Sequence, residues 1–560
     1  MPTRRLSQQD QTFRAISCPL MNHWLLMLLP LHANPVARYF YLIFHKDPFR
    51  GIYQANAFDL SILIPYFTIL SFLSIYGIHR YFLTYLYLKN KQKVPKPEKH
   101  FGSLPRVTIQ LPVFNERYVV ERLLEAVTHI DYPRALLEIQ LLDDSTDETR
   151  FVASRLVSEY ARAGHPISYY HREHREGFKA GALAEGLKQS TGELIAIFDA
   201  DFVPPSSIIR QMIDYFTDPK VAVVQGRWTW VNRHYSNLSE VEAILLDGHF
   251  VIEHGARNFS GRFFNFNGTA GMWRRIAIEE AGGWQHDTLT EDTDLSYRAQ
   301  LKGWKFIYDP NIECPSELPV EMNSFKTQQA RWAKGLIQVA KKLLPRIWRS
   351  RQPLYVKLEA TFHLTANLAY PFMVVFSVIL LPAMIVRFYQ GWFQMLYLDL
   401  PLFLASTCSV SSFYMVAQRE LYPQDWWKRL RFVPFLMATG IGLSVTNSIA
   451  VIEALLGKRS EFVRTPKYRV ELKEEGWERK KYVRRGSGWR PYAELGLAAY
   501  FIFATAYSFR VENYLTVPFL LLFFMGYSYM GMMSLFQTPM RRLWNSLPAF
   551  GRSRPASQET

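Results

Sequence analysis

Cysteine is scarce in this chain, which holds only Cys18, Cys314 and Cys408 among its 560 residues. The three are odd in number, lie far apart and show none of the short spacings at which cysteines bind zinc. Their scarcity argues against a disulfide framework and against a cysteine-based zinc site.

A long hydrophobic run is absent from about 105–357, although such runs occur on both sides of that region. Apolar residues make up 49% of the chain, yet charged residues still make up 20%, more than a uniform membrane bundle would carry. The composition therefore predicts a soluble domain joined to membrane helices.

The formal net charge of +16 has two possible explanations. A basic surplus is typical of nucleic-acid-binding proteins. It is also typical of membrane proteins, whose Lys and Arg residues collect on the cytosolic flanks of the spans. The densest basic runs, 89–99 and 473–490, adjoin long apolar segments, which favours the membrane and predicts no nucleic-acid partner.

Five segments are predicted to cross a bilayer, which takes about 20 apolar residues. They are 60–87, 362–386, 396–417, 492–508 and 515–535; the fourth of these is short and contains Glu494.

Two further apolar segments are interpreted differently. A span at 432–456 would place the basic stretch after it outside the cell, so we predict a helix that lies in the cytosolic interface. The segment 21–44 is interrupted by Pro30 and Pro35 and is either a distorted span or an interfacial helix.

These segments divide the chain into three parts and predict a multi-pass protein of the cell membrane. Residues 1–100 form a tail with membrane or interfacial helices, and 101–350 form a cytosolic α/β domain followed by interfacial helices. Residues 351–560 hold the later membrane helices, the cytosolic interfacial helix and the basic segment 457–491. The oligomeric state is not predicted.

Short apolar strands and helical patterns alternate inside the soluble domain. The predicted strands are 107–113, 137–142, 194–198 and 221–224, and the predicted helices between them are 119–130 and 148–161. Such alternation predicts a mainly parallel sheet with helices on both faces. In such sheets ligands bind beyond the carboxyl ends of the strands.

Acidic residues follow three successive strands. They are Asn115-Glu116 after the first, Asp143-Asp144 after the second and Asp199-Ala200-Asp201 after the third. Carboxylates crowded into one crevice repel each other unless cations lie between them. A divalent metal such as Mg²⁺, held by Asp199 and Asp201 with phosphate oxygens as further ligands, is the predicted occupant.

Three later motifs have both a simple and a functional interpretation. Lys179 lies in a glycine-containing segment that leads into a helix. It either belongs to a solvated basic loop or pairs with a diphosphate. Glu291 and Asp292 begin a helix, where they complement its dipole or supply a general base. Gln328, Arg331 and Trp332 form an amphipathic interfacial helix or hold a phosphate and a sugar ring.

The order of these motifs resembles that of processive family-2 glycosyltransferases, among them the cellulose, hyaluronan and mannan synthases. The resemblance covers roughly 107–335 and is strongest to plant cellulose-synthase-like mannan and glucan synthases and to bacterial cellulose synthase catalytic subunits. It rests on 142–147, 178–183, 264–271 and 316–319 in addition to the acidic motifs. It implies a GT-A fold, with the catalytic domain inserted between transmembrane helices.

The resemblance also implies a role for each matching residue. Asp292 would deprotonate the acceptor hydroxyl, while Asp201, with Asp199 beside it, would bind Mg²⁺ or Mn²⁺. The implied substrate contacts are Asp143, Asp144, Lys179, Asp199, Glu291, Gln328, Arg331 and Trp332. The implied reaction inverts the anomeric centre and turns an α-linked nucleotide sugar into a β-glycoside.

A second match lies beyond the predicted interfacial helix. Phe462, Thr465 and Lys467 resemble the gating loop of cellulose synthases, which closes over the bound nucleotide, but Arg464 replaces the valine of that motif. The resemblance implies a cytosolic loop that contacts the substrate.

The leading hypothesis is a processive β-glycan synthase that takes hexose from UDP-glucose or GDP-mannose and couples polymerisation to export. The alternative is a non-processive lipid glucosyltransferase, and a third possibility is a channel or scaffold with an inactive enzyme domain. One further cluster, His249, Glu253 and His254, lacks the spacing of the zinc-binding motif in zinc hydrolases and is interpreted as part of a structural helix.

Overall fold

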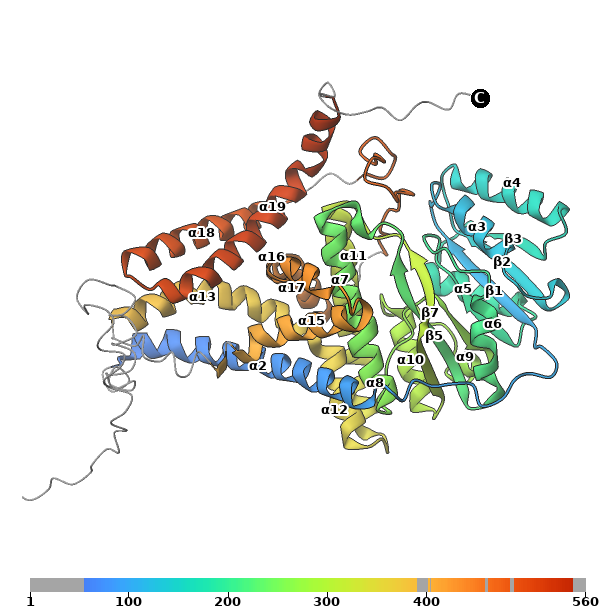
Figure 1. The fold of residues 1–560 in the computed structure, drawn as a ribbon, viewed down its shortest axis with the longest axis horizontal. Helices are drawn as coiled ribbons and strands as arrows, with labels where there is room; N and C mark the ends of the chain where they lie inside the picture. Colours follow the sequence, from blue (N-terminus) through green and yellow to red (C-terminus); the bar gives the residue numbers. More distant parts are fainter. Residues whose placement is uncertain (1–54, 390–400, 403, 459–461, 484–487, 547–560) are drawn as a thin grey trace, which may run out of the picture.

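A seven-stranded sheet forms the centre of the soluble domain (Figure 1). The computed structural model describes residues 55–389, 401–402, 404–458, 462–483 and 488–546. The strands are β1 Val107–Val113, β2 Leu137–Asp143, β3 Ile167–His171, β4 Leu194–Ile197, β5 Val221–Trp230, β6 Gly271–Arg274 and β7 Lys305–Ser316.

The strand order is β3-β2-β1-β4-β6-β5-β7. Only β6 runs antiparallel to its neighbours β4 and β5; the other pairs of adjacent strands are parallel. The prediction of a mainly parallel sheet is confirmed, and its four predicted strands lie at β1, β2, β4 and β5.

Alternation along the strands produces a core on each face of the sheet. In β4, Leu194 and Ala196 pack into one core and Ile195 and Ile197 into the other. This follows from the period of two in a strand, which sends successive side chains to opposite faces. Buried on both faces, the strand is apolar throughout.

Helices cover both faces, as the sequence predicts. On one face lie α3 Val120–Thr128, α4 Thr149–Arg162 and α6 Ile208–Ile213; on the other lie α5 Phe178–Gln189, α9 Arg275–Glu280 and α10 Glu291–Leu301. Between the sheet and the membrane-side helices come α7 Asn237–Gly248, a π-helical turn His249–His254, α8 Gly255–Phe259 and α11 Met322–Arg349 (Figure 1).

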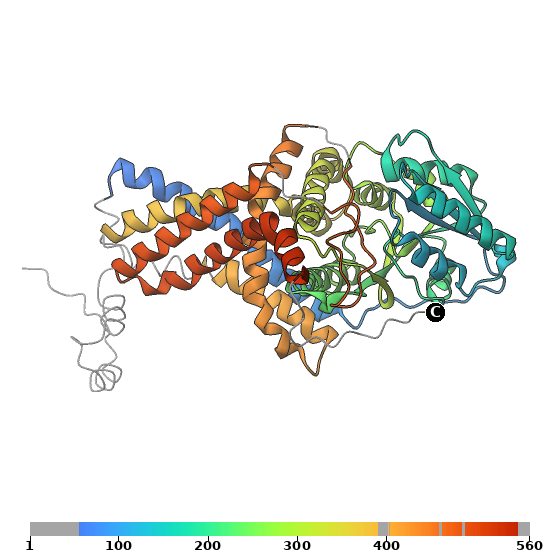
Figure 2. The same cartoon turned by 90° about the horizontal axis from the view of Figure 1, so that it is seen from above.

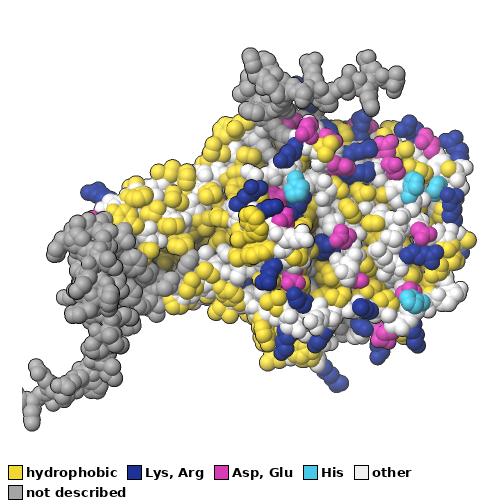
Figure 3. Space-filling view, viewed as in Figure 1, with side chains coloured by type: hydrophobic (Ala, Val, Ile, Leu, Met, Phe, Trp, Pro, Cys, Tyr) yellow, Lys and Arg dark blue, Asp and Glu magenta, His cyan; other side chains and the backbone are white. Residues whose placement is uncertain are grey.

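The remaining helices extend away from the sheet as an elongated bundle (Figures 1 and 2). They are α2 Ala57–Asn90, α12 Leu354–Thr365, α13 Ala369–Tyr389, α15 Ser409–Leu421, α16 Val433–Gly442, α17 Ser444–Leu455, α18 Arg490–Arg510 and α19 Val517–Ser546. Hydrophobic side chains gather over this bundle, whereas charged side chains gather over the α/β domain (Figure 3).

Three helices in the described residues are long and apolar enough to cross a membrane: Ala57–Asn90, Leu354–Phe388 and Tyr514–Met540. They coincide with the predicted spans 60–87, 362–386 and 515–535. The predicted span 492–508 forms α18, which packs along α19 but is not among the three. The segment 21–44, predicted as a distorted span or an interfacial helix, lies outside the described residues, as does part of the predicted span 396–417.

The segment 432–456 differs from a simple interfacial helix. It breaks into α16 and α17, which meet at a bend of 42°, and the pair would pass as one broken span. Its polar residues Thr439, Ser444 and Asn447 are buried among other helices. Whether the segment crosses the membrane or lies in its interface therefore stays a prediction.

Candidate active site

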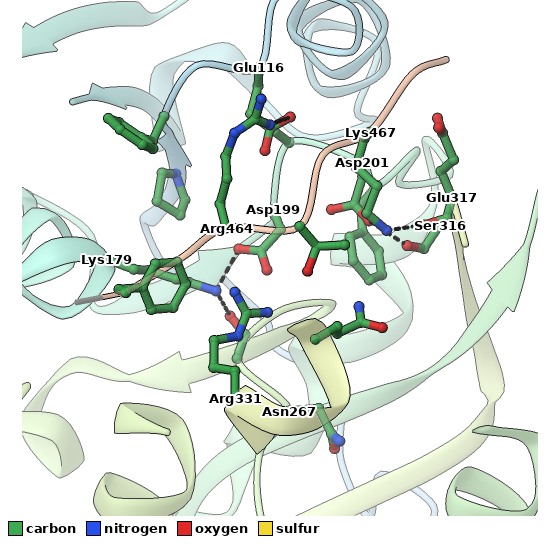
Figure 4. A pocket seen from close by; sticks show the side chains of 18 of the residues that line it. Glu116, Lys179, Asp199, Asp201, Asn267, Ser316, Glu317, Arg331, Arg464 and Lys467 are labelled. Atoms are coloured by element: carbon green, nitrogen blue, oxygen red, sulfur yellow. Dashed lines mark hydrogen bonds and ion pairs between the residues drawn. The ribbon is translucent and has the colours of Figure 1, made fainter. Parts of the chain in front are cut away.

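One cavity lies at the carboxyl edge of the sheet, where β1, β2 and β4 end (Figure 4). It collects predicted site residues from segments far apart in the sequence. The predicted residues that line it are Asp144, Lys179, Asp199, Asp201, Glu291, Asp292, Gln328, Arg331, Trp332, Phe462, Thr465 and Lys467.

Asp143 is the one predicted residue that does not line the cavity. Its side chain is fully buried, and its two oxygens accept hydrogen bonds from the backbone N–H of Ser145 (2.9 Å) and the hydroxyl of Tyr169 (2.6 Å). Asp143 therefore supports the loop after β2 from below, and its predicted contact with substrate stays a prediction.

Asp144, the next residue, lines the cavity and forms an ion pair with an arginine. Arg172 donates to both of its oxygens, from Nε at 2.7 Å and from Nη2 at 2.6 Å. The guanidinium of Arg175 lies 3.5 Å from the ring centre of Phe114 at the same end. This end of the cavity thus offers a carboxylate, guanidinium groups and an aromatic face.

Lys179 and Asp199 form an ion pair in the middle of the cavity (Figure 4), with Nζ 2.5 Å from Oδ1. Lys179 also donates to the carbonyl of Gly268 at 2.9 Å. Gly268 has a φ of +81°, and a Cβ there would lie 3.0 Å from Asp292 Oδ2, so a glycine suits this position. Burial raises the pKa of Asp199 although Lys179 opposes the shift.

Asp201 is paired with a lysine from a distant segment. Lys467 Nζ lies 2.8 Å from its Oδ2, and Ser316 Oγ donates to the same oxygen at 3.0 Å. Burial acts to raise the pKa of Asp201, but the charge and hydrogen bond of Lys467 outweigh it and the pKa is lowered. The carboxylate is therefore ionised.

The two carboxylates suit a divalent cation only with help from the substrate. Within the described residues no group of three or more His, Cys, Asp or Glu side chains surrounds a common point. Mg²⁺ commonly takes one or two carboxylates and completes its ligands with phosphate and water. Asp199 and Asp201 fit that pattern in donor type and number.

Asp292 lies one residue into α10, with Glu291 beside it at the start of the helix. Burial and the neighbouring charge of Glu291 raise the pKa of Asp292 to about 7, and burial raises that of Glu291. A carboxylate with a pKa near neutrality is a stronger base than an exposed one and still ionises at physiological pH.

Helix α11 places its three predicted residues on one face, because positions 328, 331 and 332 are spaced by three and four. Arg331 lies 4.5 Å from the ring centre of Phe462, and burial lowers its pKa against the opposing carboxylates, Glu291 first among them. Gln328 Oε1 is buried and has no hydrogen-bond partner among the described residues. An amphipathic interfacial helix alone would not explain why all three side chains line the cavity.

The segment resembling a gating loop enters the cavity itself. Phe462 stacks on Phe178 with ring centres 6.0 Å apart, and Thr465 is buried. Arg464, the departure from the family motif, forms an ion pair with Glu116, with Nη1 2.6 Å from Oε2. Burial raises the pKa of Glu116 to about 7, with Arg464 opposing the shift.

The loop leaves little space beneath it. The cavity holds about 180 Å³, whereas sites for drug-sized ligands usually have about 300–1,000 Å³. With the loop in this position, the cavity is therefore smaller than a usual site for a drug-sized ligand.

Sequence reasoning missed several lining residues. Glu116 and Arg464 were noticed at a strand end and in a loop, but received no role. Glu242, on α7, carries no sequence signal at all, because a single acidic residue in an amphipathic helix is ordinary. The His249–His254 turn matches its structural interpretation, since His249 Nδ1 pairs with Glu253 at 2.9 Å.

Comparison with known proteins agrees with the resemblance. A model of the family described as "Glycosyltransferase like family 2" matches residues 105–335. Probable glucomannan 4-beta-mannosyltransferase 15 of Arabidopsis thaliana is 33% identical over 377 residues, which is 65% of this chain and 67% of that protein. The chain belongs to the family-2 glycosyltransferases.

Other relatives match over a shorter part of the chain. Glucomannan 4-beta-mannosyltransferase 1 of Oryza sativa subsp. japonica is 41% identical over 261 residues, 46% of this chain and 50% of that enzyme. Glucomannan 4-beta-mannosyltransferase 2 of Arabidopsis thaliana is also 41% identical, over 49% of its length. The chain thus spans about half the length of these two relatives.

Among solved structures, mannosyltransferase PcManGT from Pyrobaculum calidifontis, in complex with GDP-Man and Mn²⁺, is 22% identical with a TM-score of 0.43. The similarity covers 63% of this chain and 99% of that one. The expected GT-A architecture is confirmed by the family match together with the mainly parallel, helix-covered sheet.

Proposed function

We propose that the chain is an inverting hexosyltransferase that extends a β-glycan from a nucleotide sugar. The observation that carries this proposal is the cavity itself. It brings a partly buried carboxylate of raised pKa, Asp292, together with the basic groups of Lys179 and Arg331 at the edge of a family-2 sheet. A transfer to a hydroxyl needs both a base and a site for a leaving diphosphate.

In this proposal Asp292 removes the proton from an acceptor hydroxyl as its oxygen bonds to the anomeric carbon. The bond from that carbon to the diphosphate breaks, and the nucleoside diphosphate leaves with the electron pair. Because attack and departure occur on opposite faces, the configuration inverts. Lys179 and Arg331 bind the departing diphosphate by charge-assisted hydrogen bonds.

Asp201 and Asp199 would hold Mg²⁺ or Mn²⁺, which would neutralise charge on the diphosphate. In the described residues, Lys467 Nζ lies at Asp201 where such a cation would bind. Withdrawal of the loop that carries Lys467 would free this carboxylate and widen the cavity.

We propose mannose as the transferred sugar, because two relatives that are 41% identical to this chain are named glucomannan 4-beta-mannosyltransferases. GDP-mannose is accordingly the proposed donor, with UDP-glucose as the competitor. The location proposed for the enzyme is a membrane with the α/β domain in the cytosol, since the basic segments flank the apolar helices on that side.

The test is product formation by full-length protein in detergent or nanodiscs. With labelled GDP-mannose and Mg²⁺, we expect a long product that endo-β-1,4-mannanase digests. A polymer made only from UDP-glucose would show that the donor is UDP-glucose and the transferred sugar is glucose. A single-sugar lipid product would support the alternative of a lipid glucosyltransferase. No transfer from either donor would contradict the proposal.

A further inference from the structure

One wall of the cavity has no role in the proposed transfer. It is formed by Trp228 and Trp230 at the end of β5 and by Glu242 and Leu246 on α7. These residues come from the part of the domain that faces the helix bundle (Figure 1).

Glu242 is an unusual residue for such a wall. Its side chain has an exposed fraction of 0%, and neither carboxyl oxygen has a hydrogen-bond partner among the described residues. Burial raises its pKa to about 8, and the charge of Lys467 opposes the shift. Glu242 is therefore largely protonated at neutral pH, and it can both donate and accept a hydrogen bond.

Two other carboxylates on the same helix, in contrast to Glu242, have ion-pair and hydrogen-bond partners. Glu240 pairs with Arg233 at 2.9 Å, and Asp247 pairs with the same arginine at 2.8 Å. Both also accept a further hydrogen bond, from His234 and Gln418 respectively. A buried carboxyl without partners costs free energy, so its presence at the wall of a cavity indicates that a ligand completes it.

Trp228 provides a second unpaired polar atom in this wall. Its buried Nε1 has no partner among the described residues, while its ring packs against Phe250 with ring centres 5.0 Å apart. A carboxyl that donates and accepts, an indole N–H that donates and aromatic rings together suit the hydroxyls and the apolar face of a hexose.

The position of the wall favours the acceptor over the donor. The cavity end near β1 and β2 offers a nucleotide the carboxylate of Asp144, the guanidinium of Arg175 and the ring of Phe114, whereas α7 contacts α15 and α16 on the side of the helix bundle. A glycan that extends toward the membrane helices would lie along this wall.

We propose that Glu242 and Trp228 form a hydroxyl-binding subsite for the acceptor hexose, uncovered when Lys467 leaves with its loop. The subsite rests on the proposed function, since it needs a sugar acceptor. Its role is binding and positioning of the acceptor sugar, and the proton transfer stays with Asp292.

The experiment compares Glu242→Gln and Glu242→Leu in the full-length protein, with β-1,4-manno-oligosaccharides as acceptors. Glutamine keeps a donor and an acceptor, so we expect the wild-type KM for the acceptor within about twofold. Leucine removes both and should raise that KM roughly tenfold, while the Kd for GDP-mannose stays unchanged. Glu240→Gln is the matched control, expected to lower Tm without a change in acceptor KM.

Three outcomes would overturn the subsite. They are an unchanged acceptor KM in Glu242→Leu, an equal loss of donor affinity, or a Glu242→Gln variant as impaired as the leucine variant. If Glu242→Leu does not fold, Trp228→Phe tests the second hydrogen bond, and an unchanged acceptor KM there would overturn the subsite as well.

Failure of the proposed function would be recognised separately. A wild-type protein that transfers no sugar from either donor would contradict the proposed reaction, whatever the variants do. Calorimetric titration of the oligosaccharide into the wild type and Glu242→Leu would then still measure the subsite without turnover. Equal affinities in that titration would count against it.

Discussion

Charge balance at single residues explains why this cavity suits a phosphate ligand. Four carboxylates line its centre, at Asp199, Asp201, Glu291 and Asp292, and three cations face them, at Lys179, Arg331 and Lys467. Removal of Lys467 with its loop would leave four carboxylates against two cations. A divalent cation would offset this excess of carboxylates, and its remaining ligand positions would attract a diphosphate.

Replacement of Asp292 by Asn should abolish transfer and spare donor binding. The amide cannot accept the proton of the acceptor hydroxyl, so we expect kcat to fall about 10²- to 10⁴-fold. The Kd for the donor, measured by calorimetry, should change little. Unchanged turnover would remove Asp292 from the mechanism.

The pH dependence of the wild type follows from the raised pKa of Asp292, about 7. Only the ionised form is a base, so kcat/KM should fall about tenfold per pH unit below 7 and level off above it. A profile that stays flat down to pH 5 would contradict a base with this pKa.

Stability should show the opposite trend. The folded protein holds the proton of Asp292 up to about pH 7, whereas an unfolded Asp loses it near pH 4. The folded state therefore loses stability from Asp292 as pH rises through this window, and that loss is complete above pH 7. Asp292→Asn should accordingly raise Tm at pH 8 and have little effect on Tm at pH 4; an equal effect at both would contradict this.

At the scale of elements, the loop from Phe462 to Lys467 is held to the α/β domain by three contacts. Arg464 pairs with Glu116, Lys467 pairs with Asp201, and Phe462 stacks on Phe178. Two of these contacts are charge pairs with low exposure. Ligands that compete for the carboxylates can therefore release the loop.

Arg464→Ala should open the loop locally. The pair with Glu116 is largely buried, with side-chain exposures of 11% and 13%, so its loss should speed amide exchange at 462–468 roughly tenfold or more. Arg469→Ala is the control, because its pair with Glu121 is exposed at 46% and 57% and contributes little. Equal exchange in both variants would mean that Arg464 does not hold the loop.

Helices α11 and α18 are joined by a buried ion pair that explains a charge inside an apolar segment. Lys326 Nζ lies 2.6 Å from Glu494 Oε1, and Ser534 on α19 accepts a further bond from the lysine at 3.1 Å. The helix that holds Gln328 and Arg331 is thereby fixed to the bundle.

Glu494→Gln should destabilise the protein by about 3–5 kcal/mol, because it leaves Lys326 buried without its counter-charge. The double variant Lys326→Met, Glu494→Met removes both charges and should recover most of that loss. Thermal unfolding in detergent micelles measures both. A single variant as stable as the wild type would show that the pair does not couple the two helices.

At the scale of the whole molecule, the site is shared between parts that are distant in the sequence. The sheet supplies Asp199 and Asp201, α11 supplies Arg331, and the loop beyond α17 supplies Lys467. The α/β domain and the bundle are thus expected to respond together to a ligand.

Donor binding should raise the stability of the entire chain. A ligand at 100 times its Kd stabilises by about 2.7 kcal/mol when it binds only the folded state. With Mg²⁺ present, GDP-mannose should shift Tm upward more than UDP-glucose does, and EDTA should reduce the shift. A larger shift with UDP-glucose would reverse the proposed donor preference.

The positions of four strands and of the acidic motifs were predictable, because both follow from local patterns. Apolar runs such as 107–113 form buried strands, and residues after them lie at one edge of the sheet. The short strands β3, β6 and β7 were missed: β3 carries polar side chains, and β6 and β7 depend on partners far away in the sequence.

Some candidate site residues could likewise be predicted from the sequence, whereas others could not. Asp199, Asp201 and Asp292 could be recognised from motif and position. Asp143 could not be separated from Asp144, because neighbours on a strand end point in opposite directions and only packing shows which one faces the cavity. Glu242 and the partner of Arg464 could be found only in three dimensions.

By itself, the sequence determined the mainly parallel sheet, the apolar helices around it and the family, since these depend on periodicity, hydrophobicity and motif order. The tertiary structure alone decided which charges face each other across the cavity. It placed Lys467 at Asp201, Arg464 at Glu116 and an unpaired Glu242 in the opposite wall. Such pairings depend on contacts between segments more than a hundred residues apart, which no local pattern records.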